Sequence, residues 1–286
     1  MRLITTTHDL GAALRAQRGA GRSLGLVPTM GALHAGHRSL IERSRALDDV
    51  VAVSIFVNPS QFNDPTDFER YPRSIEADLE LAGDAGADLV FAPEPTEMYP
   101  GREAIIRVDP GVLGNGLEGS SRPGHFSGVA TVVTKLFAMF GATRAYFGEK
   151  DYEQLMLVRR LAIDLSFAVE VVGCATVREQ DGLALSSRNL RLSPAQRGAA
   201  PVLYRALIAA RDLLEAGGSV ELASEVMHRS LAKEPLCVVR YAEVRDANSL
   251  EPPGAESRDL RVLVAASFGE VRLIDNVAAR LSDTSS

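Results

Sequence analysis

The sequence predicts an α/β fold, in which a parallel sheet with crossover helices is followed by a smaller α+β domain. Up to about Val177, short apolar runs alternate with segments of helical periodicity, which is the pattern of parallel strands joined by helices. Beyond Val177, long helical segments precede three strand candidates, and the last two are close enough to form a hairpin. We therefore expect two domains, at residues 1–176 and 177–286.

The strands expected in the first domain share short apolar runs bounded by polar or turn residues. They are Leu24 to Val27, Val50 to Val57, Asp88 to Phe91, Thr143 to Phe147 and Val169 to Val172. The second run is apolar almost throughout, as expected for a strand that is covered on both faces. Apolar residues at helical spacing between Ser127 and Phe140 predict a core helix. The glycine-rich stretch from Gly111 to Gly128 is expected to be a mobile loop or a lid.

In the second domain, Ser193-Pro194 predicts the start of one long helix that runs through Leu214 and ends at Gly217-Gly218. A further helix to about Lys233 follows. The expected strands after it are Val238 to Val244, Leu260 to Ala265 and Val271 to Ile274, with a hairpin at Phe268-Gly269-Glu270.

Composition limits the possible partners. The chain has 286 residues, a net charge of −6 and a pI near 5.5, which argues against nucleic acid as a main partner. Cys174 and Cys237 lack ligand spacing, so we expect reduced thiols. No leader-like or membrane-spanning apolar run is present in the sequence, and we expect a cytoplasmic protein without a membrane partner.

The segment LGLVPTMGALHAGHRSL, residues 24–40, joins a strand to a helix that carries His34 and His37. Residues three apart share a helix face, and a strand-to-helix junction is where nucleotide phosphates are commonly held. The motif therefore indicates a nucleotide site. On the motif alone, a structural role of the histidines stays open, whereas a zinc site would need a third ligand that is not evident nearby.

Three other polar clusters are candidates for binding. Asn58 to Phe62 follows a strand and offers Gln61 as donor and acceptor, although an ordinary turn explains it as well. Gly148 to Asp151, with Gln154 one helical turn later, offers a cation for phosphate at a second strand-to-helix junction. Leu185 to Asn189 supplies two hydroxyls and a guanidinium that can stabilise charge during phosphoryl transfer.

Taken together, these segments resemble the pantoate-β-alanine ligase family. The resemblance runs in order through VPTMGALHAGH, SIFVNPSQF, YPRSIEADL, SRPGHFSGVATVV, YFGEKDYEQL, TVREQDGLALSSRN and VRLIDN, and spans nearly the whole chain. It implies a Rossmann-like domain of the HIGH-motif nucleotidyltransferase superfamily, a C-terminal lid domain and a cytoplasmic homodimer. It also implies ATP-dependent condensation of (R)-pantoate with β-alanine through a pantoyl adenylate, with Mg2+ accompanying ATP.

The resemblance assigns site residues by matching positions. His37 is the expected catalytic acid, with His34, Lys150 and Arg188 beside it. The expected ATP-binding residues are Met30, Gly31, Ala32, Leu33, His34, Ala35, Gly36, His37, Gly148, Glu149, Lys150, Asp151, Val177, Leu185, Ser186, Ser187 and Arg188. The expected substrate-binding residues are Gln61, Gln154 and Asn58, and Asp78 is the expected magnesium ligand.

Two positions depart from the family pattern, because Ala35 stands where Glu is usual and Leu185 where Met is usual. Neither change removes a reacting group, and Leu for Met nearly conserves volume, so we expect altered affinity at most. Two other functions stay open. A nucleotidyltransferase would join AMP or CMP to its acceptor and keep the nucleotide in the product. A regulatory module would bind ATP without turnover. An aminoacyl-tRNA synthetase fits poorly, because the chain is acidic and has no room for an anticodon-binding domain.

Overall fold

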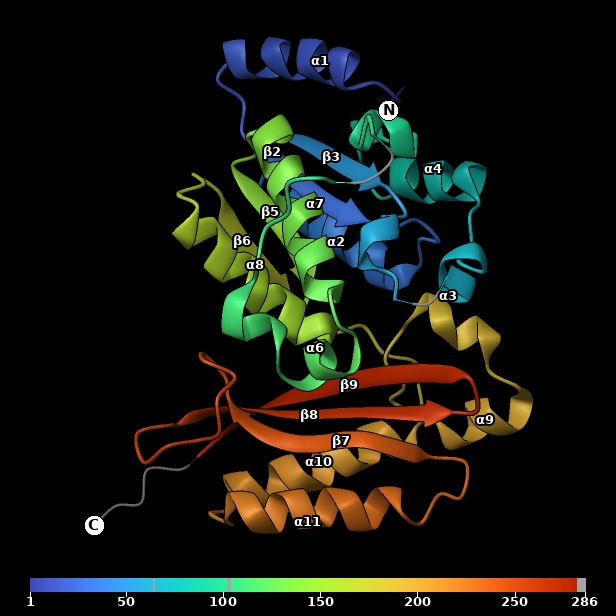
Figure 1. Cartoon of the computed structure of the whole chain (residues 1–286), viewed down its shortest axis with the longest axis vertical. Helices are drawn as coiled ribbons and strands as arrows, with labels where there is room; N and C mark the ends of the chain where they lie inside the picture. The colour runs from blue at the N-terminus through green and yellow to red at the C-terminus, as the bar shows by residue number, and fades with distance from the viewer. Residues whose placement is uncertain (64, 102–103, 282–286) are drawn as a thin grey trace. The chain divides into compact units, whose positions relative to one another are not determined.

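The computed structural model describes residues 1–63, 65–101 and 104–281, which form two compact units (Figure 1). Unit 1 comprises Met1–Glu149 and Glu153–Ala175, and unit 2 comprises Lys150–Tyr152 and the chain from Thr176 onward. The chain therefore crosses between the units three times. The expected α/β architecture with a smaller α+β unit is confirmed.

Unit 1 is built on a six-stranded parallel sheet in the order β1-β4-β3-β2-β5-β6. Its strands are β1 (Arg2–Ile4), β2 (Leu24–Thr29), β3 (Val50–Ile55), β4 (Leu89–Phe91), β5 (Arg144–Gly148) and β6 (Glu170–Cys174). All five strands expected from the sequence are present. Strand β1 was not expected from the sequence, because it has three residues of which only Ile4 is buried.

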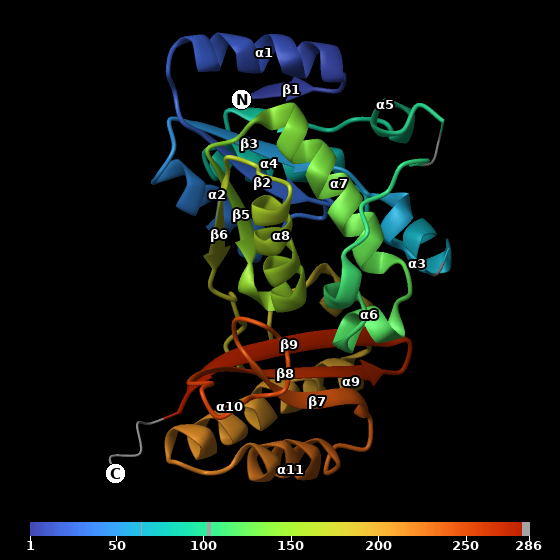
Figure 2. The ribbon, with the colours of Figure 1, turned by 60° about the vertical axis from the view of Figure 1, so that its left-hand side comes forward.

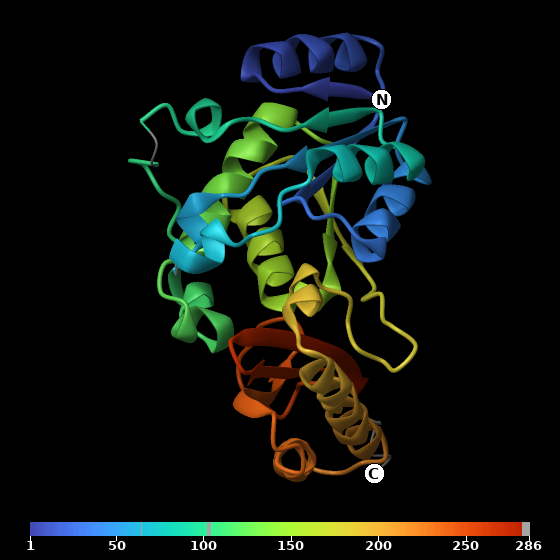
Figure 3. The same cartoon turned by 90° about the vertical axis from the view of Figure 1, so that its right-hand side faces the viewer.

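The helices of unit 1 cover both faces of this sheet. The helices are α1 (Thr7–Gly19), α2 (Ala35–Arg45), α3 (Pro65–Glu69), α4 (Ile75–Asp84), α5 (Pro95–Met98), α6 (Leu117–Ser121), α7 (His125–Phe140) and α8 (Tyr152–Asp164), with the 3-10 turns η1 (Pro59–Gln61) and η2 (Gly111–Gly114). The 3-10 turn η3 (Glu149–Asp151) and the first residue of α8 lie where the chain passes through unit 2. Figure 3 shows α2 and α4 on one side of the sheet and α7 on the other. On the side of α2, Leu40 and Ile41 pack against Val27, Val51 and Val53 of the central strands.

Strand order decides where unit 1 can bind a ligand. From β2 the chain continues to β3 and β4 on one side, whereas β5 and β6 lie on the other side. The order therefore reverses between β2 and β5, and open α/β sheets bind ligands beyond the carboxyl ends of the strands at such a point. The segment after β2 carries His34 and His37, and β5 ends at Gly148, so the segment after it starts with Glu149.

Unit 2 is an antiparallel sheet of β7 (Val238–Asp246), β8 (Asp259–Phe268) and β9 (Val271–Arg280), with α10 (Val202–Glu215) and α11 (Val220–Leu231) on one face (Figure 2). The core between them contains apolar side chains such as Leu207, Met227 and Val262. The expected hairpin joins β8 to β9 through Gly269 and Glu270, and Gly269 has the left-handed φ of +60° that this turn requires.

One helix expected in unit 2 is in fact two. The segment from Pro194 contains α9 (Pro194–Ala199) and, after a break, α10. Pro201 lies in the break, and its missing N–H group cannot continue the hydrogen bonds of α9. Ahead of α9, the 3-10 turn η4 (Ser187–Arg191) contains the expected binding residues Ser187 and Arg188.

Candidate active site

The HxGH motif caps its own helix. His34 is the N-cap of α2, and its Nδ1 accepts a hydrogen bond from the Gly36 N–H at 3.1 Å. The Nδ1 of His37 in turn accepts from the His34 N–H at 3.3 Å. A ring nitrogen that accepts carries no proton, so both rings hold their proton at Nε2 in the neutral form. This geometry supplies two N–H donors at the end of a helix, where anions are favoured.

Close packing fixes the two rings relative to each other. Their centroids are 4.2 Å apart with the planes inclined by 45°. A Cβ atom at Gly36 would lie 2.8 Å from Cε1 of His34, which is closer than van der Waals contact allows. Glycine at this position therefore lets the His34 ring fold back onto the helix end. Ala35, the departure from the family pattern, is exposed.

Asp78 holds the turn between β2 and α2. Its Oδ2 accepts from the Ala32 N–H at 3.0 Å and its Oδ1 from the Leu33 N–H at 2.7 Å. Both Gly31 and Ala32 have left-handed φ values, +81° and +52°, so a carboxylate binds a turn that a non-glycine residue adopts at a cost. Burial raises the pKa of Asp78, and the hydrogen bonds from Leu33 and Ala32 oppose that rise.

This setting does not fit the magnesium ligand expected at Asp78. Both carboxylate oxygens face backbone N–H groups, which carry partial positive charge and disfavour a cation at the same oxygens. In the described ranges 1–63, 65–101 and 104–281, no three His, Cys, Asp or Glu side chains come together as a metal site. We assign no chemical step to a metal at Asp78.

A second cluster lies after β3 and is centred on Asn58. Its Nδ2 donates to Oε1 of Gln61 at 3.0 Å and to the Gly128 carbonyl at 3.1 Å. Its Oδ1 accepts from the hydroxyls of Ser60 at 2.8 Å and Tyr99 at 3.1 Å. The two donor and two acceptor positions of the Asn58 amide are thus in use, which fixes the orientation of this buried group.

Gln61 is held from several directions. Its Nε2 lies 3.1 Å from Sδ of Met30, which joins this cluster to the turn after β2. Its backbone carbonyl accepts from Nδ1 of His125 at 2.7 Å and from Arg122 at 3.3 Å. The structure therefore brings Met30, Asn58 and Gln61 together, whereas no hydrogen bond among the described residues joins Gln61 to Gln154, which lies half-buried in the first turn of α8.

The backbone of helix α7 packs directly against the backbone of this cluster. A Cβ atom at Gly128 would lie 2.3 Å from the Ser60 carbonyl oxygen, so only glycine allows the contact between α7 and η1. Tyr99, Arg122, His125 and Gly128, which contact this cluster, were not expected from the sequence as parts of the site. The stretch from Gly111 to Gly128, expected to be a mobile loop or a lid, contains η2, α6 and the first turn of α7.

The segment after β5 carries the second set of expected ATP residues. Gly148 ends β5, and Glu149, Lys150 and Asp151 form η3. The Lys150 ammonium is 3.4 Å from Oδ1 of Asp151, and 18% of the Lys150 side chain is exposed. The Lys150 carbonyl accepts from the Asn276 side chain at 2.8 Å, so this part of the segment is bonded within unit 2.

The remaining expected ATP residues form one folded loop of unit 2. The Leu185 N–H donates to the Val177 carbonyl at 3.0 Å, and this bond closes the loop formed by the residues between them. Ser186 then caps η4, because its hydroxyl accepts from the Arg188 N–H at 3.2 Å. Ser187 and Arg188 follow in η4 and are half-buried. The structure therefore collects Val177, Leu185, Ser186, Ser187 and Arg188 in one place.

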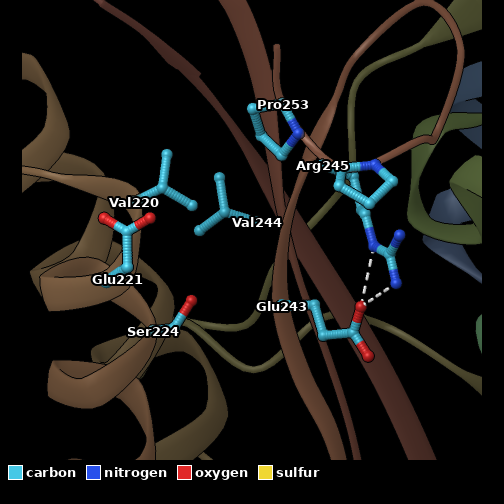
Figure 4. A pocket seen from close by; sticks show the side chains of 8 residues that line it. Val220, Glu221, Ser224, Glu243, Val244, Arg245 and Pro253 are labelled. Atoms are coloured by element: carbon cyan, nitrogen blue, oxygen red, sulfur yellow. Dashed lines mark hydrogen bonds and ion pairs between the residues drawn. The ribbon is translucent and has the colours of Figure 1, made fainter.

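A cavity of about 380 Å³ lies elsewhere in unit 2, between α11 and β7 (Figure 4). Its lining residues are Val220, Glu221, Ser224, Glu243, Val244, Arg245, Pro252 and Pro253. The Arg245 guanidinium is bonded to the Glu243 carboxylate, with Nε at 2.7 Å. None of these residues is among the expected site residues.

Cys174 and Cys237 are free thiols, as the sequence analysis expected. Burial raises the pKa of Cys237 to about 11 and also raises that of Cys174. Among the helices that the structure describes, none combines the length and the apolar character needed to cross a membrane.

Comparisons with known proteins agree along the whole chain. The family model described as "Pantoate-beta-alanine ligase" matches residues 2–278. A pantothenate synthetase of Cereibacter sphaeroides is 49% identical over 96% of this chain and 98% of its own. The crystal structure of pantothenate synthetase from Thermus thermophilus superposes with a TM-score of 0.91 at 49% identity, covering 97% of this chain and 99% of that one.

A third relative was solved with ligands. The pantoate-beta-alanine ligase of Francisella tularensis, complexed with an ATP ligand and β-alanine, has a TM-score of 0.81 and 33% identity, and the match covers 97% of each chain. The sequence motifs, the fold and these matches all point to the same family. The chain belongs to the pantoate-beta-alanine ligase family.

Proposed function

We propose that this protein condenses pantoate with β-alanine at the expense of ATP, through a pantoyl adenylate. The observation that carries the proposal is the family match over residues 2–278, together with the self-capped HxGH motif at the point where the strand order reverses. ATP enters as its magnesium complex and is a substrate. Cytoplasmic location and a homodimer are parts of the proposal that rest on the family resemblance alone.

In the first step, a carboxylate oxygen of pantoate attacks the α-phosphorus of ATP, and the bond to the bridging oxygen of the β-phosphate breaks. Pyrophosphate leaves with the electron pair of that bond. The neutral rings of His34 and His37 donate from Nε2 to oxygens that gain negative charge. Lys150, Ser186, Ser187 and Arg188 supply further donors for the triphosphate, and Met30 to His37, Gly148 to Asp151, Val177 and Leu185 line the nucleotide.

In the second step, the amine nitrogen of β-alanine attacks the acyl carbon. The bond from this carbon to the AMP oxygen breaks, AMP leaves, and the nitrogen loses a proton as the amide forms. Gln61 and Gln154 hold pantoate in both steps, because their amides can donate to its carboxylate and accept from its hydroxyls, and Asn58, whose own amide is fully bonded, takes part by orienting Gln61. Orientation of two anionic substrates is the main contribution of the site, and this effect can supply about 7–11 kcal/mol of the barrier.

The test is isotope exchange between pyrophosphate and ATP, measured with magnesium and pantoate but without β-alanine. Pantoate-dependent exchange, absent with a panel of other small carboxylic acids, is the expected result, because the adenylate step is reversible. A protein that binds ATP but gives no exchange with any acid would contradict the two-step reaction. It would favour a nucleotidyltransferase or a regulatory module instead.

A further inference from the structure

The last strand of the chain carries two buried polar residues whose contacts reach the ATP segments of unit 2. Asp275 and Asn276 of β9 are each 3% exposed. Along β9, Leu273 and Val277 belong to the apolar core cluster, and Asp275 lies between them on the same face of the strand. A carboxylate on an apolar face requires a specific partner, because an unpaired buried charge is strongly destabilising.

That partner is Arg178, which lies next to Val177. Its Nη1 is 2.6 Å from one carboxylate oxygen of Asp275 and its Nη2 is 2.9 Å from the other, a bidentate pair. The same guanidinium donates to the Gly182 carbonyl at 3.0 Å and stacks over the Tyr204 ring at 4.1 Å. Through Arg178, Asp275 is thereby connected to the start of the loop between Val177 and Leu185 and, at Gly182, to its turn.

Asn276 extends the connection to the segment after β5. Its Oδ1 accepts from Nε of Arg261 at 2.6 Å, which leaves its Nδ2 to donate to the Lys150 carbonyl at 2.8 Å. Arg261 is itself buried, and its guanidinium lies 4.0 Å from the Tyr152 ring. The hydroxyl of Tyr152 donates to the Ala247 carbonyl at 2.9 Å. The residues from Lys150 to Tyr152 are thus bound at both ends.

We propose that Asp275 and Asn276 are positioning residues for ATP: Asp275 orients the loop of Val177 and Leu185 through Arg178, and Asn276 orients Lys150 through its backbone. The inference rests on the proposed function, which places these segments against the nucleotide. Two neighbouring residues of β9 then fix the position of two nucleotide segments that are distant in sequence, the Val177–Leu185 loop and the segment that starts at Lys150. Asp275 and Asn276 belong to the VRLIDN motif, which has no role in the two chemical steps. The positioning role assigns this motif a function in ATP binding.

The decisive variant is Asn276→Asp, because it keeps an oxygen for Arg261 and replaces the amide donor with an oxygen that cannot donate to Lys150. We expect kcat/KM for ATP to fall roughly 10- to 100-fold, since small misplacements of a binding group have effects of this size. The fall in kcat/KM should come from a higher KM for ATP. The KM for pantoate should stay within about twofold of the parent. Asp259→Asn, which breaks an exposed 3.7 Å ion pair on β8, is the matched control and should change neither constant.

A second pair of variants tests Asp275 independently. Asp275→Asn and Arg178→Lys each remove the bidentate geometry, and each should raise KM for ATP. If the two residues act as one unit, the double variant should be no worse than the poorer single variant. If Asn276→Asp does not fold, Arg261→Lys, which loosens the amide orientation of Asn276, should still raise KM for ATP, and an unchanged KM would overturn the role of Asn276.

Lys150→Ala, assayed in parallel, separates the two proposals. A raised KM for ATP in Lys150→Ala and in Asn276→Asp supports the positioning role. A raised KM in Lys150→Ala alone overturns it and leaves the proposed function intact. Unchanged ATP use in both variants overturns the role of Lys150 and the inference with it. Variants that lose only thermal stability, with KM for ATP unchanged, would show that Asp275 and Asn276 act solely in the core of unit 2.

Discussion

The imidazoles of His34 and His37 form hydrogen bonds with the backbone of their own helix. Each ring uses Nδ1 to accept a hydrogen bond from an amide at the start of α2. This use of Nδ1 excludes the doubly protonated ring in the same geometry and leaves Nε2 as the protonated nitrogen. Helix capping therefore favours the neutral tautomer, so the contacts that stabilise the helix end also decide which ring nitrogen can donate.

Replacement of His37 by asparagine separates these two roles. The asparagine oxygen can take the place of Nδ1 as acceptor for the His34 N–H, but the donor at Nε2 is lost. We expect kcat to fall roughly 10²- to 10³-fold, as for loss of one preorganised donor, with little change in thermal stability. Turnover within about threefold of the parent would contradict the role of His37.

Asp78→Asn tests how the turn after β2 is held. Asparagine keeps one acceptor oxygen, but its amide group faces a second backbone N–H and leaves that donor unsatisfied. We expect the free energy of unfolding to fall by about 1–3 kcal/mol, measured by urea denaturation. Asp84→Asn, at the exposed end of the same helix, is the control and should stay close to the parent.

Gln61→Ala should impair pantoate and spare ATP. The side chain of Gln61 contacts Asn58 and Met30, and its loss removes the amide proposed to hold the pantoate carboxylate. Calorimetric titration should show that the affinity for pantoate falls at least about tenfold, which is the loss expected for one or two hydrogen bonds to a charged group. The affinity for ATP should stay within about twofold of the parent. Gln17→Ala on α1 serves as the control. Equal losses for both ligands would contradict the assignment.

At the scale of elements, α2 has a glycine in its first turn where the ring of its N-cap residue needs space. Glycine within a helix costs roughly 0.5–1 kcal/mol relative to alanine, yet Gly36 lies in the first turn of α2. The space beside it is filled by the His34 ring. The helix thus gives up stability to allow the ring to fold back on its N-terminus.

Gly36→Ala should therefore lower activity through His34. The added Cβ would stand 2.8 Å from Cε1 of His34, so the ring must move. We expect kcat/KM for ATP to fall about 10-fold or more, since a preorganised donor is displaced. Gly198→Ala in α9 is the matched control, because no atom lies within 4 Å of its added Cβ. If both variants keep parental kinetics, the glycine is not required for the position of His34.

Elements with strong local patterns could be predicted from the sequence. The strands of the parallel sheet follow from apolar runs such as Val50 to Val53, and the β8–β9 hairpin follows from Gly269 and its neighbours. The prediction of one long helix from Pro194 was wrong, because the apolar period continues through Pro201 but Pro201 has no N–H group to continue the helical hydrogen bonds. The periodic stretch is therefore divided into two helices. Strand β1 was not expected, since its three residues are too few to show a period.

At the scale of the whole molecule, the division into units does not follow the order of the chain. Lys150–Tyr152 belongs to unit 2 although the residues on both sides belong to unit 1. The bonds that place it there join residues 95 and 126 positions apart, from Tyr152 to Ala247 and from Asn276 to Lys150. No local pattern contains such pairs. The sequence motifs could therefore suggest candidate site residues, but not the distant residues that form hydrogen bonds with them.

A cut between the units should not separate the two pieces. We expect a protease site introduced after Ala175, an exposed residue at the second crossing into unit 2, to yield fragments that stay together. The N-terminal fragment carries Tyr152, which is buried and bonded to Ala247 in the C-terminal fragment. Size-exclusion chromatography of the cleaved protein under native conditions should give one peak that contains both fragments. Two separate peaks would contradict this prediction.

The bond between Asn276 and the Lys150 carbonyl also orders events during synthesis. Lys150 precedes Asn276 by 126 residues, so at roughly 5–20 residues per second the ribosome adds Asn276 about 6–25 s later. During that interval the strands of unit 1 can pair, while the Lys150 carbonyl still waits for its donor on β9. A nascent chain therefore forms this bond only after Asn276 has been added, later than the residues of the parallel sheet of unit 1 become available for pairing.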